Sequence, residues 1–299
     1  MLNRTIAPPI VDAVNFNLQL QPYQKYVLKN GVAVYAIDAG TEEVLQIEWV
    51  FDGGNWFEEK NLQAAVTNFL LKNGTTTRTA FEINEHFEYY GAHLSRNCGA
   101  EFATVTLHTL TKYTGKLLPV IREILSEASL LQSEMDIALQ NMKQKLDVNL
   151  KKSSFVAGRL IDTYLFGEQH PYGRFSRHQD FDALTREDLL TFYDQYYRTG
   201  SFKIFVAGKI PADLEILLEQ HFGDFTNIKK PGRQYIAQPA QEHKFHILND
   251  EKSSQSSIKL ARSFGNRHHP DFLKAQVLNI VLGGFFGSRL MANIREDKG

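Results

Sequence analysis

The sequence predicts an α+β fold in which helices cover a largely antiparallel sheet. Segments with strand-like alternation of apolar residues are mixed with segments of helical periodicity, without the regular β-α alternation of a doubly wound fold. Asn30-Gly31 stands between two alternating apolar runs, so residues 26–38 are predicted to form a hairpin. Residues 92–96 and 103–109 are predicted to form a second antiparallel pair.

The other elements are predicted from the same periodicities. Residues 61–75 are expected to form a buried helix that stops at Asn73-Gly74. Its apolar stripe consists of Leu62, Ala65, Val66, Phe69 and Leu70. Thr185, with an acidic residue three positions later, is predicted to cap a helix over 185–197. Further helices are predicted over 81–90, 117–128, 135–146, 156–164, 211–221, 272–282 and 288–298. Further strands are predicted over 46–52, 202–207, 244–248 and 257–260.

The length and composition fit two domains. The chain has 299 residues, of which 43% are hydrophobic, which is enough for two cores of ordinary size. The helical and strand patterns fade into a polar segment that contains proline and glycine, so residues 226–242 are predicted to be a linker. We therefore expect an N-terminal domain over 1–225 and the start of a second, related domain over 243–299, which is cut short at its end.

Charge and targeting signals exclude several classes of function. The formal net charge is −1, from 33 basic and 34 acidic residues, so no field favours nucleic acid or anionic lipid. The single cysteine, Cys98, cannot form an intramolecular disulfide, and neither a signal peptide nor a long apolar run is visible. These features predict a cytoplasmic protein, or a periplasmic one if a signal peptide has been removed.

Ten histidines invite a search for a metal site, but their spacing does not form one. His268-His269 is best interpreted as a polar turn before a proline, and His93 and His108 lie in predicted strands that nothing in the sequence pairs. Cys98 has no neighbouring base, and neither G-x-S-x-G nor a phosphate-binding loop occurs. No self-contained catalytic motif is therefore visible.

A glycine-rich stretch, LGGFFGSRL, leads into the last predicted helix. The simple interpretation is a turn before a helix N-terminus. The functional alternative is a loop that contacts peptide, since free N–H groups point outward there. Its candidate residues are Gly283, Gly284, Phe285 and Phe286.

Several stretches together resemble the pitrilysin/insulinase-like zinc metallopeptidases, which include mitochondrial processing peptidase. The resemblance rests on five stretches, which keep the family's order and spacing over essentially the whole chain. They are YVLKNGVAVYAID, residues 61–75, FGEQHPYGR, LTREDLLTFYDQYYRTGSFKIFVAGKI and LGGFFGSRLMANIREDKG.

The resemblance implies a two-layer α+β domain that occurs twice, with a chamber for extended peptide between the copies. Active members are similar in binding zinc through H-x-x-E-H on the helix that corresponds to residues 61–75, with a later glutamate as third ligand. In this chain Ala65 and Phe69 replace the two histidines, and Asn68 replaces the general base. Residues 144–146, where the third ligand would fall, contain no carboxylate.

The resemblance therefore implies an inactive homologue without a cofactor of its own. Such a chain would be the partner or scaffold of a zinc-containing homologous subunit, or would self-associate, in the degradation or processing of peptides. Inactive subunits of this kind are similar in supplying an arginine to the reaction in trans, and residues 294–299 match the first half of that motif. Arg295 is the candidate, and a solvated arginine at a helix end is the alternative.

Two other functions stay open at this point. One is a zinc endopeptidase with a rearranged site, formed by Glu85, His86 and His93. The other is a purely structural subunit.

Overall fold

The computed structural model describes residues 19–231, 234–239 and 256–298. Its internal contacts divide the chain into two compact units. Unit 1 takes its described residues from 1–152 and 174–236, and unit 2 from 153–173 and 237–299. The domain boundaries predicted from the sequence stay predictions.

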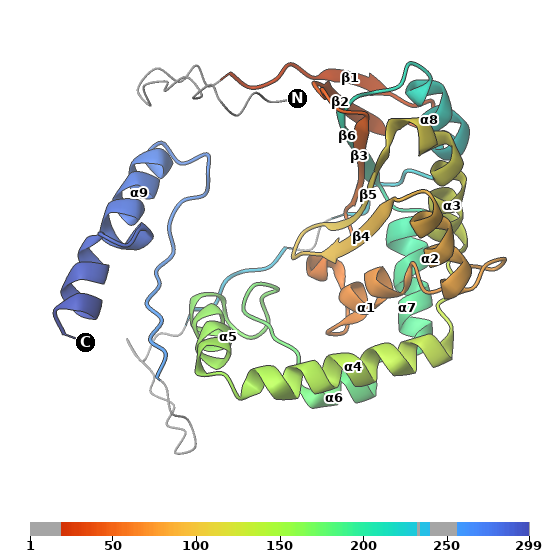
Figure 1. Cartoon of the computed structure of the whole chain (residues 1–299). Helices are drawn as coiled ribbons and strands as arrows, with labels where there is room; N and C mark the ends of the chain where they lie inside the picture. Colours follow the sequence, from red (N-terminus) through yellow and green to blue (C-terminus); the bar gives the residue numbers. More distant parts are fainter. Residues whose placement is uncertain (1–18, 232–233, 240–255, 299) are drawn as a thin grey trace. The chain divides into compact units, whose positions relative to one another are not determined.

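Unit 1 contains a mixed six-stranded sheet, with the strand order β1-β2-β6-β3-β5-β4 (Figure 1). The strands are β1 (Gln24–Val27), β2 (Ala33–Asp38), β3 (Val44–Phe51), β4 (His93–Cys98), β5 (Ala103–Leu110) and β6 (Phe202–Gly208). β2 and β6 are parallel, and the other neighbouring strands are antiparallel. The α+β class, the hairpin and the second antiparallel pair predicted from the sequence are confirmed.

The tip of the hairpin is fixed by the two residues that predicted it. Gly31 has φ +86°, a left-handed conformation that glycine adopts without strain. The Asn30 side chain donates from Nδ2 to the carbonyl oxygens of Phe222 and Phe225, both at 2.8 Å, and its Oδ1 accepts from Val32 N. The turn is thus tied to the C-terminal end of unit 1.

Helices cover one face of the sheet (Figure 1). They are α1 (Gln63–Leu70), α2 (Ala80–Tyr89), α3 (Thr114–Glu127), α7 (Arg186–Tyr193) and α8 (Leu214–Phe222), with the short helical segments η2 (Asn55–Phe57), η3 (Thr111–Tyr113) and η4 (Asp194–Arg198). α4 (Gln132–Leu150) packs on α1, and α6 (His178–Ala183) packs on α4. α8 begins three residues later than predicted, after Pro211, with Asp213 as its N-cap.

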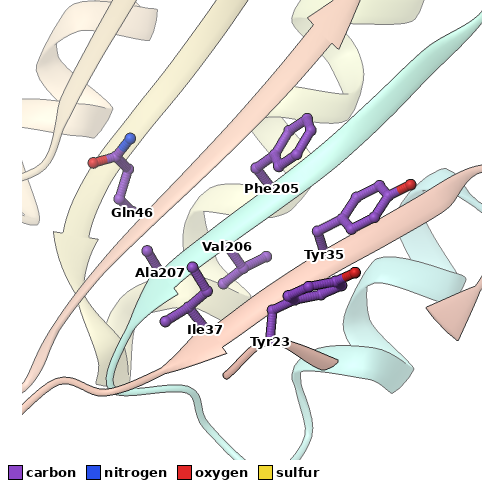
Figure 2. A pocket seen from close by; sticks show the side chains of 7 residues that line it. All are labelled: Tyr23, Tyr35, Ile37, Gln46, Phe205, Val206 and Ala207. Carbon is purple, nitrogen blue, oxygen red and sulfur yellow. The ribbon is translucent and has the colours of Figure 1, made fainter. Parts of the chain in front are cut away.

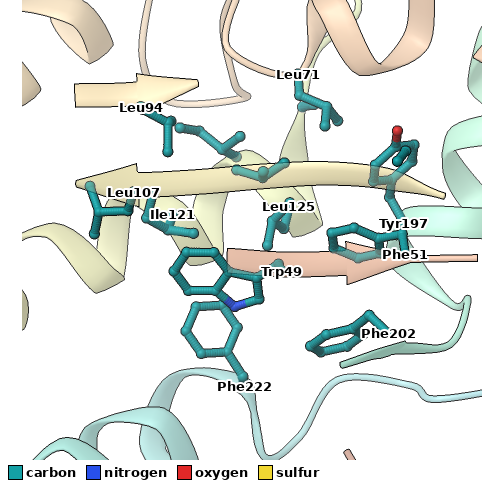
Figure 3. Packing of buried hydrophobic residues seen from close by; sticks show 14 of the residues in the cluster. Trp49, Phe51, Leu71, Leu94, Leu107, Ile121, Leu125, Tyr197, Phe202 and Phe222 are labelled. Atoms are coloured by element: carbon teal, nitrogen blue, oxygen red, sulfur yellow. The ribbon is translucent and has the colours of Figure 1, made fainter. Parts of the chain in front are cut away.

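The core lies between this face and the helices (Figure 3). On β3, residues at alternate positions are buried, which is the period of a strand with one covered face. Trp49 packs on Phe222 of α8 with 5.2 Å between ring centroids, and Phe51 packs on Tyr197 of η4 at 4.8 Å. The central strand therefore joins the N-terminal sheet to helices encoded much later in the chain.

Unit 2 consists of α5 (Ser153–Phe166), α9 (Phe272–Asn279), η5 (Ile280–Gly284) and η6 (Met291–Glu296) in its described part. The strand predicted over 257–260 is wrong, since these residues have no strand assignment and Ile258 and Leu260 are exposed. No described strand lies beside this segment to accept its backbone hydrogen bonds, so the apolar alternation alone does not make it a strand. The strand predicted over 244–248 lies outside the described residues.

Candidate functional site

Helix α1 carries the residues that the resemblance aligns with the metal motif, and polar side chains fix its start. At its start, Glu58 Oε2 accepts a hydrogen bond from Ala64 N at 3.1 Å, and Gln63 Nε2 donates to Asp188 O at 2.7 Å. The helix ends at Leu70, four residues before Gly74, so the predicted stop at Asn73-Gly74 ends the following turn and not the helix itself. Gly74 has φ +125° in that turn. The helix predicted over 61–75 is confirmed, with shorter limits.

The buried face of α1 differs from the predicted apolar stripe. Val66 and Leu70 are buried, but Leu62 and Ala65 are half-buried and Phe69 is 39% exposed. The difference arises because polar residues occupy part of the buried face. Thr67 is fully buried and donates to Gln63 O at 2.7 Å, so burial costs its hydroxyl no hydrogen bond.

Asn68, which the resemblance aligns with the general base, belongs to this buried polar face. Its Nδ2 donates to Tyr197 Oη at 3.1 Å and to Thr104 O at 3.3 Å. Tyr197 is itself fully buried, and burial raises the pKa of its hydroxyl. The amide therefore links α1 to β5 and η4 inside the core, while Ala65 and Phe69 lie on the more exposed side of the helix.

The region expected to hold a third ligand lies on α4, which packs against α1. Gln144 is exposed and Leu146 is buried there. Within the described ranges, no group of three or more His, Cys, Asp and Glu residues is arranged to hold a metal ion.

Arg96 is a charged neighbour of α1 that sequence reasoning missed. It lies on β4, and its guanidinium carbon is 5.2 Å from the centroid of the Phe69 ring. Its Nη1 donates to Phe69 O at 2.7 Å. The sequence contained a signal for this position. Arg96 is two residues from the buried Leu94 in a predicted strand, and residues two apart point to the same face of a sheet. A permanent cation therefore stands beside Phe69, which the resemblance aligns with a metal ligand.

A buried ion pair lies at the other end of α1. Glu58 is 3% exposed and accepts from Arg174 Nη2 at 2.9 Å. Burial raises the pKa of Glu58 to about 7, although Arg174 and the backbone N–H donors favour the charged form. Cys98 is half-buried nearby, and burial, together with the charge of Glu58, raises the pKa of its thiol to about 12. This thiol is poorly suited to act as a nucleophile.

The residues of the alternative metal site are not brought together as a group. His86 Nε2 lies 3.1 Å from Lys116 O. His93 instead pairs with His108 across β4 and β5, with 6.4 Å between the two ring centroids. The sequence could not predict this pairing, since it depends on the strand register.

A hollow of about 260 Å³ lies on the opposite face of the sheet, over β2 and β6 (Figure 2). Tyr23, Tyr35 and Phe205 stand around it, and the rings of Tyr35 and Phe205 are stacked with centroids 5.1 Å apart. The lining is almost wholly apolar, so the hollow suits a side chain better than a polar ligand.

The predicted residues of unit 2 are exposed at the surface of its described part. Gly283 and Gly284 end η5, and Phe285 and Phe286 follow with exposed side chains. Arg295 lies in the last turn of η6 and is exposed. Both predicted roles, contact with peptide and stabilisation in trans, stay predictions. None of the described helices is long and apolar enough to cross a membrane.

Comparisons with known proteins agree on one family. The family described as "Peptidase M16 inactive domain" matches residues 183–299. An "uncharacterized zinc protease" of Rickettsia felis is 23% identical over 278 residues, which cover 91% of this chain and 66% of that protein. A "probable mitochondrial-processing peptidase subunit beta" of Schizosaccharomyces pombe is 25% identical, over 86% of this chain and 58% of that protein. The chain thus spans less than two thirds of the length of these curated relatives.

Solved structures share the fold. The crystal structure of a peptidase M16 inactive domain from Pseudomonas fluorescens aligns with a TM-score of 0.76 at 21% identity, over 93% of this chain and 68% of that one. The motif helix, the mixed sheet with its covering helices and the match of the C-terminal segment all lead to the same assignment. The chain is thus similar to the pitrilysin-like M16 peptidases over most of its length, and its C-terminal part matches the family's inactive domain.

Proposed function

We propose that this chain is a non-catalytic partner or scaffold subunit of a zinc-containing homologue, and that the pair degrades or processes peptides. The observation that carries the proposal is the state of α1. Asn68 is bonded into the core where a general base would stand, and Ala65 and Phe69 offer no ligand atoms.

The rest of the unit supports a retained role. The sheet, the capped helices and the ion pair between Glu58 and Arg174 form a regular core around α1. A chain of this design can present a peptide-binding surface without performing hydrolysis. The Schizosaccharomyces pombe relative is described as one subunit of a processing peptidase, which makes a paired assembly a natural expectation.

Co-expression with a homologue that contains an intact H-x-x-E-H motif tests the proposal. We expect a stable complex by size-exclusion chromatography and a peptidase activity above that of the homologue alone. The matched control is the same homologue with its motif glutamate replaced by glutamine, which should form the complex without activity. Absence of both a complex and an activity gain would contradict the proposal.

The two alternatives predict other results. A zinc endopeptidase with a rearranged site would show about one zinc per chain and activity by itself. A purely structural subunit would form the complex but would neither bind peptide nor change the activity.

A further inference from the structure

The guanidinium of Arg96 has one edge engaged and the other edge open. Nη1 donates to Phe69 O at 2.7 Å and lies 3.5 Å from Asn73 Oδ1. Neither Nε nor Nη2 has an acceptor among the described residues. Neither atom is fully buried. Both donors are therefore open to solvent. Nε and Nη2 form the edge of the guanidinium fork that matches a carboxylate with two parallel hydrogen bonds.

The surroundings of Arg96 lack the anion that such a group normally has. Arg96 is half-buried, and no carboxylate of the described residues forms an ion pair with it. A second cation, Lys72, lies nearby over the ring of Phe87 at 5.8 Å. Burial lowers the pKa of Lys72 most, the charge of Arg96 lowers it further, and Glu88 opposes this. Two cations therefore lie near each other, with Glu88 beside Lys72 and Glu134 bonded to the far side of the Asn73 amide, 2.8 Å from its Nδ2.

Capping of α1 explains only the engaged edge. Phe69 O is one of the last carbonyls of the helix, and a cation is favourable there. This contact uses Nη1 alone, and lysine could provide it equally well. β4 is the last strand of the sheet, so one of its backbone edges is unpaired.

We propose that Arg96 anchors a carboxylate-binding site beside the vacated metal position, and that its ligand is a carboxylate of a bound peptide. The inference deepens the proposed function and rests on its claim that the chain binds peptides. The carboxylate comes from a peptide C-terminus or from an acidic side chain. A fixed cation with two open donors would then hold the peptide where active homologues hold a metal.

Fluorescence anisotropy with short peptides tests the inference on the full chain. The probes carry fluorescein at the N-terminus and are randomised over uncharged residues. They are prepared with a free C-terminal carboxylate, as the C-terminal amide, and as the amide with one internal glutamate. We expect at least one of the two acidic probes to bind about tenfold to a hundredfold more tightly than the neutral amide, since hydrogen bonds to charged groups are among the stronger ones.

Variants locate the effect. Arg96→Gln should abolish the preference for the acidic probe, and Arg96→Lys should retain part of it as a point charge. Arg198→Gln is the matched control, because it removes the same charge from an exposed i,i+4 pair with Asp194 and should leave the preference unchanged.

Each contrary outcome has a distinct meaning. Equal binding of all three probes by the unmodified chain overturns the carboxylate site and leaves the proposed function standing. This comparison needs no variant, so it holds even if Arg96→Gln does not fold. A preference that survives in folded Arg96→Gln also overturns the inference. Binding of none of the probes overturns both the inference and the peptide-binding part of the proposed function, whereas the complex with the homologue is measured separately.

Discussion

At the scale of single residues, buried polar side chains determine how α1 is oriented. Asn68 and Thr67 occupy the side that the apolar pattern assigns to solvent, because each finds its hydrogen-bond partner inside the core. Phe69 is correspondingly displaced to the surface and covered in part by Arg96. The buried Asn68 thus helps to set which residues of α1 face outward.

Asn68→Ala should destabilise unit 1 by about 1–3 kcal/mol, since it leaves Tyr197 Oη and Thr104 O buried without this partner. Urea unfolding followed by circular dichroism measures the change. Asn84→Ala on α2 is the control, because it removes a hydrogen bond to the carbonyl four residues earlier on the same helix at a half-buried position. An effect at position 68 no larger than that at position 84 would contradict the structural role of Asn68.

Glu58 should make the stability depend on pH. Its pKa rises from the ordinary value of 4.5 to about 7 in the folded protein, so the folded state binds the proton more tightly than the unfolded state. The contribution from this group is fully present below pH 4.5, and it is lost as the pH rises through about 7. The total change is on the order of 3 kcal/mol.

Glu58→Gln tests this dependence, because glutamine does not titrate. As the pH increases from 5 to 8, the unmodified protein should lose stability that the variant does not lose. The free energy of unfolding of the variant, relative to that of the unmodified protein, should therefore rise with pH. The exposed neighbour provides the control, and Glu59→Gln should follow the unmodified protein. If the difference between Glu58→Gln and the unmodified protein does not change with pH, the carboxylate does not titrate in this range.

At the scale of elements, helices with local start signals were predictable. Thr185 accepts from Asp188 N, and Asp188 Oδ2 accepts from Thr185 N at 2.8 Å, so the weak capping signal in the sequence is a full capping box. Thr79 and Glu82 form another at the start of α2. Each box satisfies backbone N–H groups that a helix otherwise leaves open.

Thr185→Ala should lower the stability by about 1 kcal/mol, since it removes the acceptor of the first turn of α7. Thr185→Ser keeps the hydroxyl and should cost much less. Thermal unfolding of the two variants beside the unmodified protein separates loss of the cap from loss of the methyl group. Equal losses in both variants would mean that packing, and not capping, is what threonine contributes.

Local chemistry sets the limit of what the sequence could predict. The hairpin at Asn30-Gly31 and the helix at Thr185 were predictable because their signals lie within a few residues. The outward face of α1 and the pairing of His93 with His108 depend on partners far along the chain, which no local pattern contains. The strand predicted over 257–260 was wrong for the same reason, since a strand needs a neighbouring strand for its backbone hydrogen bonds.

At the scale of the whole molecule, the family resemblance predicted the fold, while the motif positions that it implies stay predictions. It could predict the fold because the order and spacing of several segments are specific when taken together, even where each segment alone is a weak match. The role of Arg295 belongs to this scale as well, because it concerns a second subunit. The residue is exposed in the last turn of η6, where it can reach a partner.

Arg295→Ala should leave the complex with a zinc-containing homologue intact and lower its kcat about 100-fold to 1,000-fold, if Arg295 stabilises developing charge on the substrate. Steady-state kinetics of the reconstituted pair measures the loss. Arg289→Ala, a nearby change of the same kind, should have little effect. An unchanged kcat for Arg295→Ala would mean that Arg295 is a solvated surface residue with no role in the reaction.

The position of β6 in the sheet has a consequence for biosynthesis. β6 lies between β2 and β3, so the first hairpin cannot join the rest of the sheet until residues 202–208 have left the ribosome. At about 5–20 residues per second, this leaves one edge of β2 unpaired for on the order of ten seconds or more. Unpaired strand edges invite association with other chains. Slower translation between β5 and β6 should therefore increase the demand for chaperones and lower the yield of folded protein.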